Sequence, residues 1–210
     1  MLEGVEVLNH SSIKMNKTKV IYIDPYKVYK AYNDADLIFI THNHYDHYSE
    51  EDIDKVKKES TYYIVPKDLQ NNLINRGIKQ EKIILVKPNE IYTIDGIKFS
   101  TVPAYNINKN FHPKENNWVG FIIEIEGNRY YIAGDTDLNQ DNIKVKCDVA
   151  FVPVGGTYTM DYKEAAELTN QIKPKVAVPI HYGSIVGTKQ DAINFINLLD
   201  KQIEGKILIK

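Results

Sequence analysis

The sequence predicts an α/β fold in which mixed sheets are covered by helices. Short β-rich runs alternate with amphipathic helical patterns along 210 residues, without a linker, a low-complexity tract or a short-period repeat. Two of the runs flank Glu126-Gly127-Asn128, a short glycine-containing loop that is typical of an antiparallel hairpin. Later runs alternate with helical patterns, as in β–α–β units with parallel strands. We therefore expect one domain over residues 1–210 with both antiparallel and parallel pairs.

The predicted strands are runs rich in β-branched and aromatic residues. In chain order they are Gly4–Leu8, Ile13–Met15, Val20–Ile23, Leu37–Ile40, Tyr62–Val65, Lys82–Val86, Tyr92–Ile94, Ile97–Val102, Trp118–Ile125, Arg129–Ala133, Val149–Val152, Val176–Ile180 and Lys206–Ile209. The run Leu37–Ile40 is apolar throughout, so we expect it to be buried on both faces of its sheet.

The predicted helices follow patterns with a period near 3.6 residues. They are Pro25–Asn33, Glu50–Lys58, Lys67–Asn75, Tyr162–Ile172 and Lys189–Leu199. Asp161 is placed to cap the fourth of these, because Glu164 follows three residues later and Pro174 lies just past the end.

The composition favours an ordinary globular protein that acts on small molecules. The chain is 43 % hydrophobic and 26 % charged, and its net charge is -2, which offers no general attraction to nucleic acid or anionic membranes. The start is acidic and lacks the apolar stretch of a signal peptide, and no apolar run is long enough to span a bilayer. The single cysteine, Cys147, is expected to be a buried, inert thiol, and we expect a cytoplasmic protein.

A histidine-rich hexapeptide directly follows the apolar run Leu37–Ile40 and Thr41. It reads His42-Asn43-His44-Tyr45-Asp46-His47 and holds three of the six histidines of the chain. Neutral imidazole and carboxylate are ligands that Zn²⁺, Mn²⁺ and Fe²⁺ share. The alternation puts His42 and His44 on one side of an extended chain. A turn could then aim Asp46 and His47 at a second metal about 3.5–4 Å away.

Two further predicted strands end in residues that bind metals. Asp135 follows Gly134, which permits a tight turn after Arg129–Ala133, and His181 follows Val176–Ile180. Taken alone, each is more often a structural feature. Together with the hexapeptide they predict a metal site.

These motifs resemble the metallo-β-lactamase fold superfamily, whose pattern is His-x-His-x-Asp-His followed by single ligands from separate loops. Within it, the chain is similar to the small hydrolase branch that includes ascorbate-6-phosphate lactonase. That branch has a histidine-serine pair, an Ile-Asp-Pro segment and a glycine-rich loop, found here as His10-Ser11, Ile23-Asp24-Pro25 and Pro153–Asp161. The resemblance runs from about Val5 to His181 and beyond.

The resemblance implies a four-layer αββα sandwich with one or two divalent ions, Zn or else Mn, Fe or Ni. It assigns His42 and His44 to a first metal and Asp46, His47 and His181 to a second, with Asp135 bridging. It implies hydrolysis by a metal-bound hydroxide, with Asp46 as the catalytic group that orients it or accepts its proton. The substrate would be a small, anionic ester, lactone or phosphodiester.

The sequence departs from the family at the third histidine of the first site. The family places it after a strand like Ile97–Val102, where this chain has Tyr105 and Asn106. Either His112 reaches back from a longer loop to metal or substrate, or the first site lacks that ligand and His112 is an exposed loop residue.

Other residues have two interpretations each. His10, Lys114 and Gly156 are candidates for substrate binding, but packing, an ordinary surface lysine and a plain turn explain them as well. Asp24, Thr41 and Thr136 are candidates to hold the histidines in place, and Asp24 could instead cap a helix.

Three rival functions remain at this point. A nuclease would be expected to carry a basic patch. A redox di-iron protein would carry a carboxylate where His44 stands. A regulatory protein that binds metal without turnover is the third.

Overall fold

The computed structural model describes residues 1–209, and the chain divides into two compact units. The N-terminal unit is Leu2–Lys87, and the C-terminal unit runs from Pro88 onward together with Met1. Each holds one mixed sheet with helices, which confirms the α/β class. That the chain is a single domain stays a prediction.

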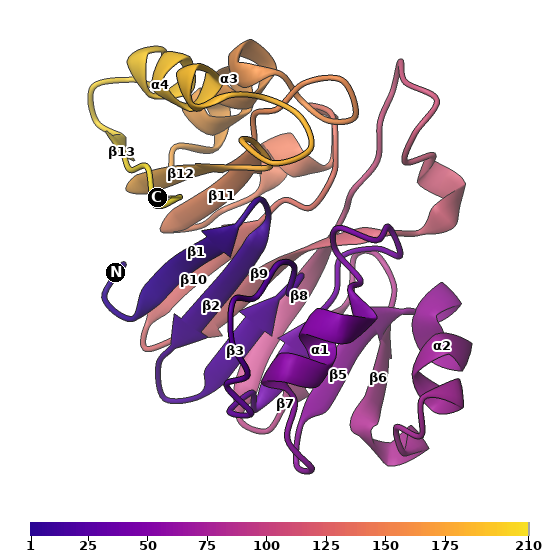
Figure 1. Ribbon diagram of the computed structural model, residues 1–210. Coiled ribbons are helices and arrows are strands. Elements are labelled where there is room, and N and C mark those ends of the chain that lie inside the picture. The colour runs from indigo at the N-terminus through magenta and orange to yellow at the C-terminus, as the bar shows by residue number, and fades with distance from the viewer. Residues whose placement is uncertain (210) are drawn as a thin grey trace. The chain divides into compact units, whose positions relative to one another are not determined.

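The N-terminal unit is built on a six-stranded sheet in the order β1-β2-β3-β4-β5-β6 (Figure 1). Its strands are β1 (Val5–Asn9), β2 (Ser12–Asn16), β3 (Val20–Ile23), β4 (Leu37–Phe39), β5 (Tyr62–Pro66) and β6 (Ile83–Val86). The first three pair antiparallel, and β3 to β6 run parallel. The helices are α1 (Glu50–Val56), α2 (Gln70–Asn75) and the short 3₁₀ turns η1 (Lys67–Leu69) and η2 (Gln80–Lys82).

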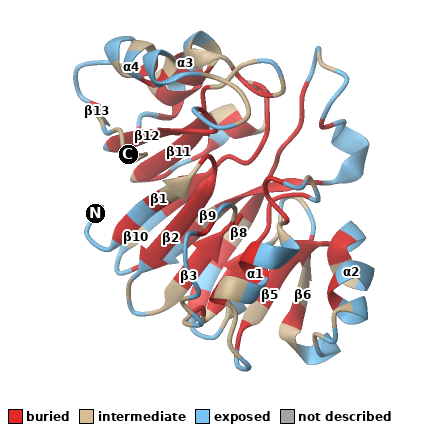
Figure 2. Ribbon diagram, in the orientation of Figure 1, coloured by how far each residue is buried: buried red, intermediate tan, exposed pale blue. Residues whose placement is uncertain are grey.

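The core of this unit lies between the sheet and its helices. All three residues of β4 are buried, as the apolar run predicts, and the strands are largely red in Figure 2. Ile38 and Tyr63 of the sheet belong to one cluster with Ile53 and Val56 of α1 and Leu73 of α2. The helices therefore bury one apolar stripe each, the usual way a short helix is stabilised.

The predicted helix Pro25–Asn33 is wrong, because this segment forms no helix. Lys27 and Asn33 have positive φ angles of 50°. The backbone N–H groups of Lys27 and Val28 donate to the Asp52 carboxylate at 2.8 and 2.9 Å. These donors are therefore satisfied by a side chain of α1 and not by helix carbonyls.

The C-terminal unit is built on a seven-stranded sheet in the order β13-β12-β11-β10-β9-β8-β7. Its strands are β7 (Ile91–Ile94), β8 (Ile97–Pro103), β9 (Val119–Ile125), β10 (Asn128–Ile132), β11 (Val149–Pro153), β12 (Val176–Ile180) and β13 (Glu204–Gly205). β7 to β10 pair antiparallel, and β10 to β13 run parallel. The helices are α3 (Tyr162–Ile172), α4 (Lys189–Asn197), η3 (Lys114–Asn116) and η4 (Asn142–Lys144).

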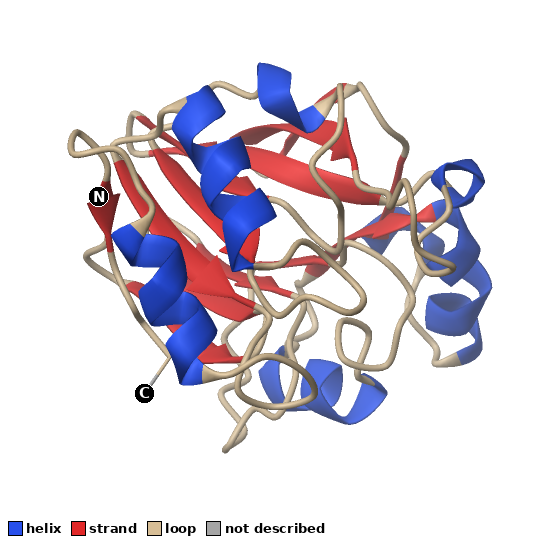
Figure 3. Ribbon diagram, turned by 90° about the horizontal axis from the view of Figure 1, so that it is seen from above, coloured by secondary structure: helices blue, strands red, loops and turns tan. Residues whose placement is uncertain are grey.

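Local signals in this unit are confirmed. β9 and β10 form the expected hairpin, and Glu126 and Gly127 at its turn have positive φ angles of 49° and 74°. Asp161 caps α3 in a capping box with Glu164. Leu168 of α3 and Phe195 of α4 share one buried cluster with residues of β11 and β12. The helices of this unit (blue in Figure 3) lie side by side against their strands (red).

The last predicted strand is misplaced. Only Glu204 and Gly205 pair with β12, and Lys206–Ile209 forms no strand. Ile207 and Ile209 pack against the buried cluster of the C-terminal unit. The short apolar run Ile207-Leu208-Ile209 therefore reflects packing on the core and not sheet pairing.

Candidate metal centre

In the N-terminal unit, two neighbouring parallel strands end beside each other and bring Asp24 to Thr41. Asp24 follows β3 directly, and its backbone N–H donates to the Phe39 carbonyl at the end of β4. The buried Asp24 carboxylate accepts from the Thr41 N–H at 2.8 Å and from the Thr41 hydroxyl at 2.7 Å. Its Oδ2 also lies 2.7 Å from Nδ1 of His47. Of its two interpretations, Asp24 therefore holds a histidine and does not cap a helix.

The three imidazoles of the hexapeptide gather at this strand end. Nε2 of His42 lies 3.1 Å from Nδ1 of His44, and the rings of His42 and His47 have centroids 4.0 Å apart. The Thr41 hydroxyl lies 3.0 Å from Nδ1 of His42. Because Asp24 contacts Nδ1 of His47, Nε2 is the atom of that ring that can bind a metal.

Asp46 lies beside His47 and His10. Its Oδ2 is 3.5 Å from Nε2 of His47 and 3.4 Å from Nε2 of His10. His10 comes from the turn between β1 and β2 and is 1 % exposed. We call the set His10, Asp24, Thr41, His42, His44, Asp46 and His47 the N-terminal cluster.

In the C-terminal unit, His112, Asp135 and His181 converge. Oδ2 of Asp135 lies 3.2 Å from Nε2 of His112 and 3.1 Å from Nε2 of His181. β8, β10 and β12 run in the same direction, so the segments that follow them begin at one edge of the sheet. All three side chains are buried. We call these residues, with Asn106, the C-terminal cluster.

His112 reaches back to this edge from a longer loop. It is 2 % exposed, so the interpretation as an exposed loop residue is wrong. The side-chain amide of Asn106 lies 3.2 Å from Nδ1 of His112, and the Asn106 N–H donates to the His112 carbonyl at 2.9 Å. Sequence reasoning missed this role of Asn106. Asn106 stands shortly after β8, where the family carries a histidine, and this position could have indicated its role.

Four residues of these clusters have a left-handed backbone. The φ angles are 50° for His10, 46° for Asp24, 59° for His112 and 58° for His181. Such conformations are uncommon for residues other than glycine and concentrate at functional sites, where the surrounding structure holds them. Gly134 has a φ of 67°, which confirms the tight turn expected before Asp135.

Gly155 shapes the same edge by permitting a close approach. A Cβ atom there would lie 2.2 Å from the His181 carbonyl oxygen. The N–H of the next residue, Gly156, donates to the Met160 carbonyl at 3.0 Å. The loop is thus closed by its own hydrogen bonds, which favours the interpretation of Gly156 as part of a plain turn.

Two further candidates, Lys114 and Thr136, bond to residues outside the set of candidate ligands. The Lys114 ammonium pairs with Asp141 at 3.2 Å and contacts the Tyr105 hydroxyl. Thr136 donates to the Tyr105 carbonyl at 3.0 Å, so it supports a loop and not a histidine. Burial raises the pKa of the Cys147 thiol to about 12, which fits the expected inert thiol.

The donor set of both clusters suits a divalent first-row metal. Every candidate ligand offers an imidazole nitrogen or a carboxylate oxygen, which is the donor chemistry of Zn²⁺, Mn²⁺ and Fe²⁺ sites. Burial raises the pKa of Asp24, while His47 and Thr41 act in the opposite direction. A buried carboxylate that contacts a histidine in this way orients the ring for a metal.

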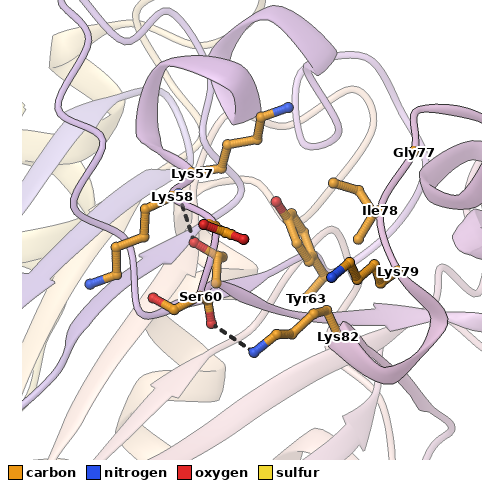
Figure 4. Close-up of a pocket in the computed structure, with 10 residues that line it drawn as sticks. Lys57, Lys58, Ser60, Tyr63, Gly77, Ile78, Lys79 and Lys82 are labelled. Atoms are coloured by element: carbon orange, nitrogen blue, oxygen red, sulfur yellow. Dashed lines mark hydrogen bonds between the residues drawn. The ribbon is translucent and has the colours of Figure 1, made fainter.

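A hollow of about 820 Å³ in the N-terminal unit contains none of these residues (Figure 4). It is lined by Lys57, Lys58, Glu59, Ser60, Thr61, Tyr63, Gly77, Ile78, Lys79 and Lys82. Lys57 and Lys58 pair with Asp54 and Asp36, and Lys82 donates to the Ser60 carbonyl. This hollow lies where β5 begins, whereas the N-terminal cluster follows the end of β4. The positive charge of the lysines that line the hollow is partly neutralised by their carboxylate partners. It is not a second candidate centre.

No helix in residues 1–209 is both long enough and apolar enough to cross a membrane.

Comparisons with known proteins place these clusters in a family context. Residues 5–181 match the sequence model of the beta-lactamase superfamily domain. A protein of Thermococcus onnurineus named UPF0173 metal-dependent hydrolase is 31 % identical, over 97 % of this chain and 95 % of its own length. A solved structure from Parabacteroides distasonis, assigned as a metal-dependent hydrolase, is 30 % identical with a TM-score of 0.83, covering 97 % and 91 % of the two chains. A metallo hydrolase from Ignicoccus hospitalis shares the fold, with a TM-score of 0.79, 23 % identity and coverage of 97 % and 93 %.

Proposed function

Because the chain belongs to the beta-lactamase superfamily, we propose that it is a metal-dependent hydrolase and that the residues of each cluster serve as metal ligands. The observation that carries the proposal is the gathering of three imidazoles and the Asp46 carboxylate at the end of β4. His42, Asp46 and His47 are buried, and burying such groups together is unfavourable unless a metal or a hydrogen bond compensates for their lost hydration. The named activity of the relatives supports the same conclusion.

We propose the following distribution of ligands. His42, His44 and His112 bind one ion, and Asp46, His47 and His181 bind a second, with Asp135 between them. The convergence of His112 and His181 on Asp135 supports its bridging role. His112 thereby supplies the histidine ligand that the family carries directly after β8 and that this chain lacks there. The expected ions are Zn²⁺, or else Mn²⁺, Fe²⁺ or Ni²⁺.

One or two divalent ions held there supply Lewis acidity, which activates water near neutral pH and polarises the substrate oxygen. Asp46 orients the attacking water or accepts its proton. His10 lies 3.4 Å from Asp46 and holds that carboxylate in place. Asp24 and Thr41 fix the rings of His47 and His42.

The proposed substrate is a small, anionic ester, lactone or phosphodiester. A divalent centre attracts an anion, and a net charge of -2 gives no general affinity for the phosphate backbone of nucleic acids. We further infer that the protein acts in the cytoplasm, where a single unpaired cysteine is stable in its reduced form.

Hydrolysis of bis-p-nitrophenyl phosphate and of a simple lactone tests the proposal. We expect turnover that is lost on chelation, restored by a divalent metal and abolished in Asp46→Asn. The control is Glu59→Gln, which makes the same chemical change at an exposed residue outside the clusters. Binding of metal without turnover of any ester, lactone or phosphodiester would instead indicate a regulatory protein.

A further inference from the structure

We propose that Tyr45 and Tyr26 form a binding subsite for a flat, apolar group of the substrate, such as an aryl ring. The subsite belongs to the N-terminal unit and adjoins Asp46. The inference rests on the proposed function, because such a subsite selects among the substrates of that centre.

Tyr45 is a large aromatic residue held at the surface within the metal motif. It stands between His44 and Asp46 and is 65 % exposed, while Asp46 and His47 are buried. An exposed aromatic ring forgoes the stabilisation that burial would give, and it is common where proteins bind ligands. The backbone around Tyr45 is held in a turn, because the N–H groups of His47 and Tyr48 donate to the His44 carbonyl at 2.9 and 2.8 Å. Its ring is therefore presented next to the reacting groups.

Tyr26 gives Tyr45 a rigid partner. The two rings meet edge to face, with centroids 6.1 Å apart and planes at 76°. The Tyr26 ring also meets the ring of His10, with centroids 6.3 Å apart and planes at 62°. Both are preferred geometries of aromatic pairs. The two tyrosines thus form a preordered surface, and a ligand that packs on it loses little side-chain entropy of the protein.

The segment that carries Tyr26 is itself anchored. The Asp52 carboxylate binds the N–H groups of the next two residues, Lys27 and Val28. This anchoring replaces the helix that the sequence pattern predicted, and it holds Tyr26 beside Tyr45. The irregular backbone of residues 25–33 therefore positions Tyr26 for the proposed subsite.

The ring pair is linked to the reacting groups by direct contacts. His10, which packs on Tyr26, has its Nε2 3.4 Å from Oδ2 of Asp46. One substrate molecule would therefore place its aryl group on Tyr26 and Tyr45 and its ester or phosphoryl group near Asp46.

The C-terminal cluster also has an exposed aromatic residue next to a candidate ligand. Phe111, next to His112, is 46 % exposed and meets Tyr158 edge to face at 4.7 Å. Ligand pockets are commonly lined by aromatic side chains around a few polar groups. Within its own unit, each cluster therefore has an exposed aromatic ring next to a candidate ligand.

The test compares two probes with one head group, phenylphosphonate and methylphosphonate, by isothermal titration calorimetry of the metal-containing protein. We expect the phenyl probe to bind about tenfold more tightly, the size of effect given by an aromatic contact with its buried area. Tyr45→Ala should remove this preference and leave the affinity for methylphosphonate unchanged. Tyr45→Phe, which keeps the ring, should retain it.

Tyr29→Ala is the matched control. Tyr29 is 72 % exposed and meets edge to face, at 5.6 Å, the ring of Tyr32, which lies outside the metal motif. It should leave both affinities unchanged. Equal affinity for the two probes in the native protein, or binding of neither, overturns the subsite, as does a preference that survives Tyr45→Ala. Metal content and turnover of the phosphodiester, measured on the same samples, report separately on the proposed function.

Discussion

The carboxylate of Asp24 lies 2.7 Å from Nδ1 of His47, and both side chains are almost fully buried. The pair joins the ends of two neighbouring parallel strands, since Asp24 follows β3 and His47 lies in the hexapeptide after β4. The Thr41 N–H and hydroxyl occupy the other positions around the same carboxylate. Asp24 therefore determines which nitrogen of His47 can bind a metal.

The first prediction concerns this pair. Asp24→Asn should weaken Zn²⁺ binding about 10–100-fold, the usual effect of removing the carboxylate that orients a ligating histidine. A carboxylate only accepts hydrogen bonds and therefore keeps the proton of His47 on Nδ1. An amide can also donate to Nδ1, so it does not fix the position of that proton. The measurement is the Zn²⁺ dissociation constant from competition with a chromophoric chelator.

Asp36→Asn is the control for this experiment. Asp36 precedes β4 and accepts from Val20 and Lys58, at the opposite end of the same strand. It should lower stability without changing Zn²⁺ affinity. An unchanged affinity in Asp24→Asn would show that His47 is held by other contacts.

The second prediction concerns Asn106, which binds both the Tyr158 carbonyl and the ring of His112. Asn106→Ala should weaken metal binding less than His112→Ala does. The first variant removes the hydrogen bond that orients the His112 ring, whereas the second removes the ring itself. Zn²⁺ titrations of the two variants measure the order. Asn72→Ala, on the exposed face of α2, is the control. Full metal content and full activity in His112→Ala would contradict its role as a ligand.

The third prediction concerns the anchor of residues 25–33. Asp52→Ala removes a buried carboxylate that accepts from the backbone N–H groups of Lys27 and Val28 and from the side chains of Ser49 and Lys55. It should lower the free energy of unfolding by about 2–4 kcal/mol, since hydrogen bonds to charged groups are worth about 1.5–3 kcal/mol each and are not additive. Urea denaturation monitored by circular dichroism measures the change.

The same carboxylate gives this effect a pH dependence. Burial acts to raise the pKa of Asp52, but the bonds from Lys55, Ser49 and the two backbone N–H groups outweigh it and hold the pKa below the ordinary value of 3.8. The folded state thus favours the charged form. Its stabilising contribution is complete above the ordinary pKa and is lost as the pH falls through the lowered one. The stability difference between the native protein and Asp52→Ala should narrow from pH 7 toward about pH 3; a constant difference would contradict this.

Much of the fold could be predicted because its signals are local. The apolar run of β4, the turn at Glu126-Gly127 and the cap at Asp161 lie within a few residues of what they determine. The hexapeptide after β4 is predictable for the same reason, since one short segment supplies several candidate ligands.

What the sequence did not reveal depends on contacts between distant residues. Residues 25–33 read as a helix because the acceptor for their N–H groups is Asp52, more than twenty residues away. Asn106 was missed as a support because its partner His112 lies across a loop. The segment Lys206–Ile209 was misassigned as a strand because apolar residues that pack on the core, here Ile207 and Ile209, form the same kind of short apolar run as a buried strand.

The most direct test of the central claim is the metal content of the purified protein by inductively coupled plasma mass spectrometry, compared with His42→Ala and Asp135→Ala. These variants remove one candidate ligand from each cluster. We expect one to two equivalents of a divalent first-row metal in the native protein and a loss of metal in both variants, with circular dichroism showing that the variants stay folded. The central claim would be contradicted if the native protein, purified in the presence of these metals, contained none of them and if both variants were as stable as the native protein.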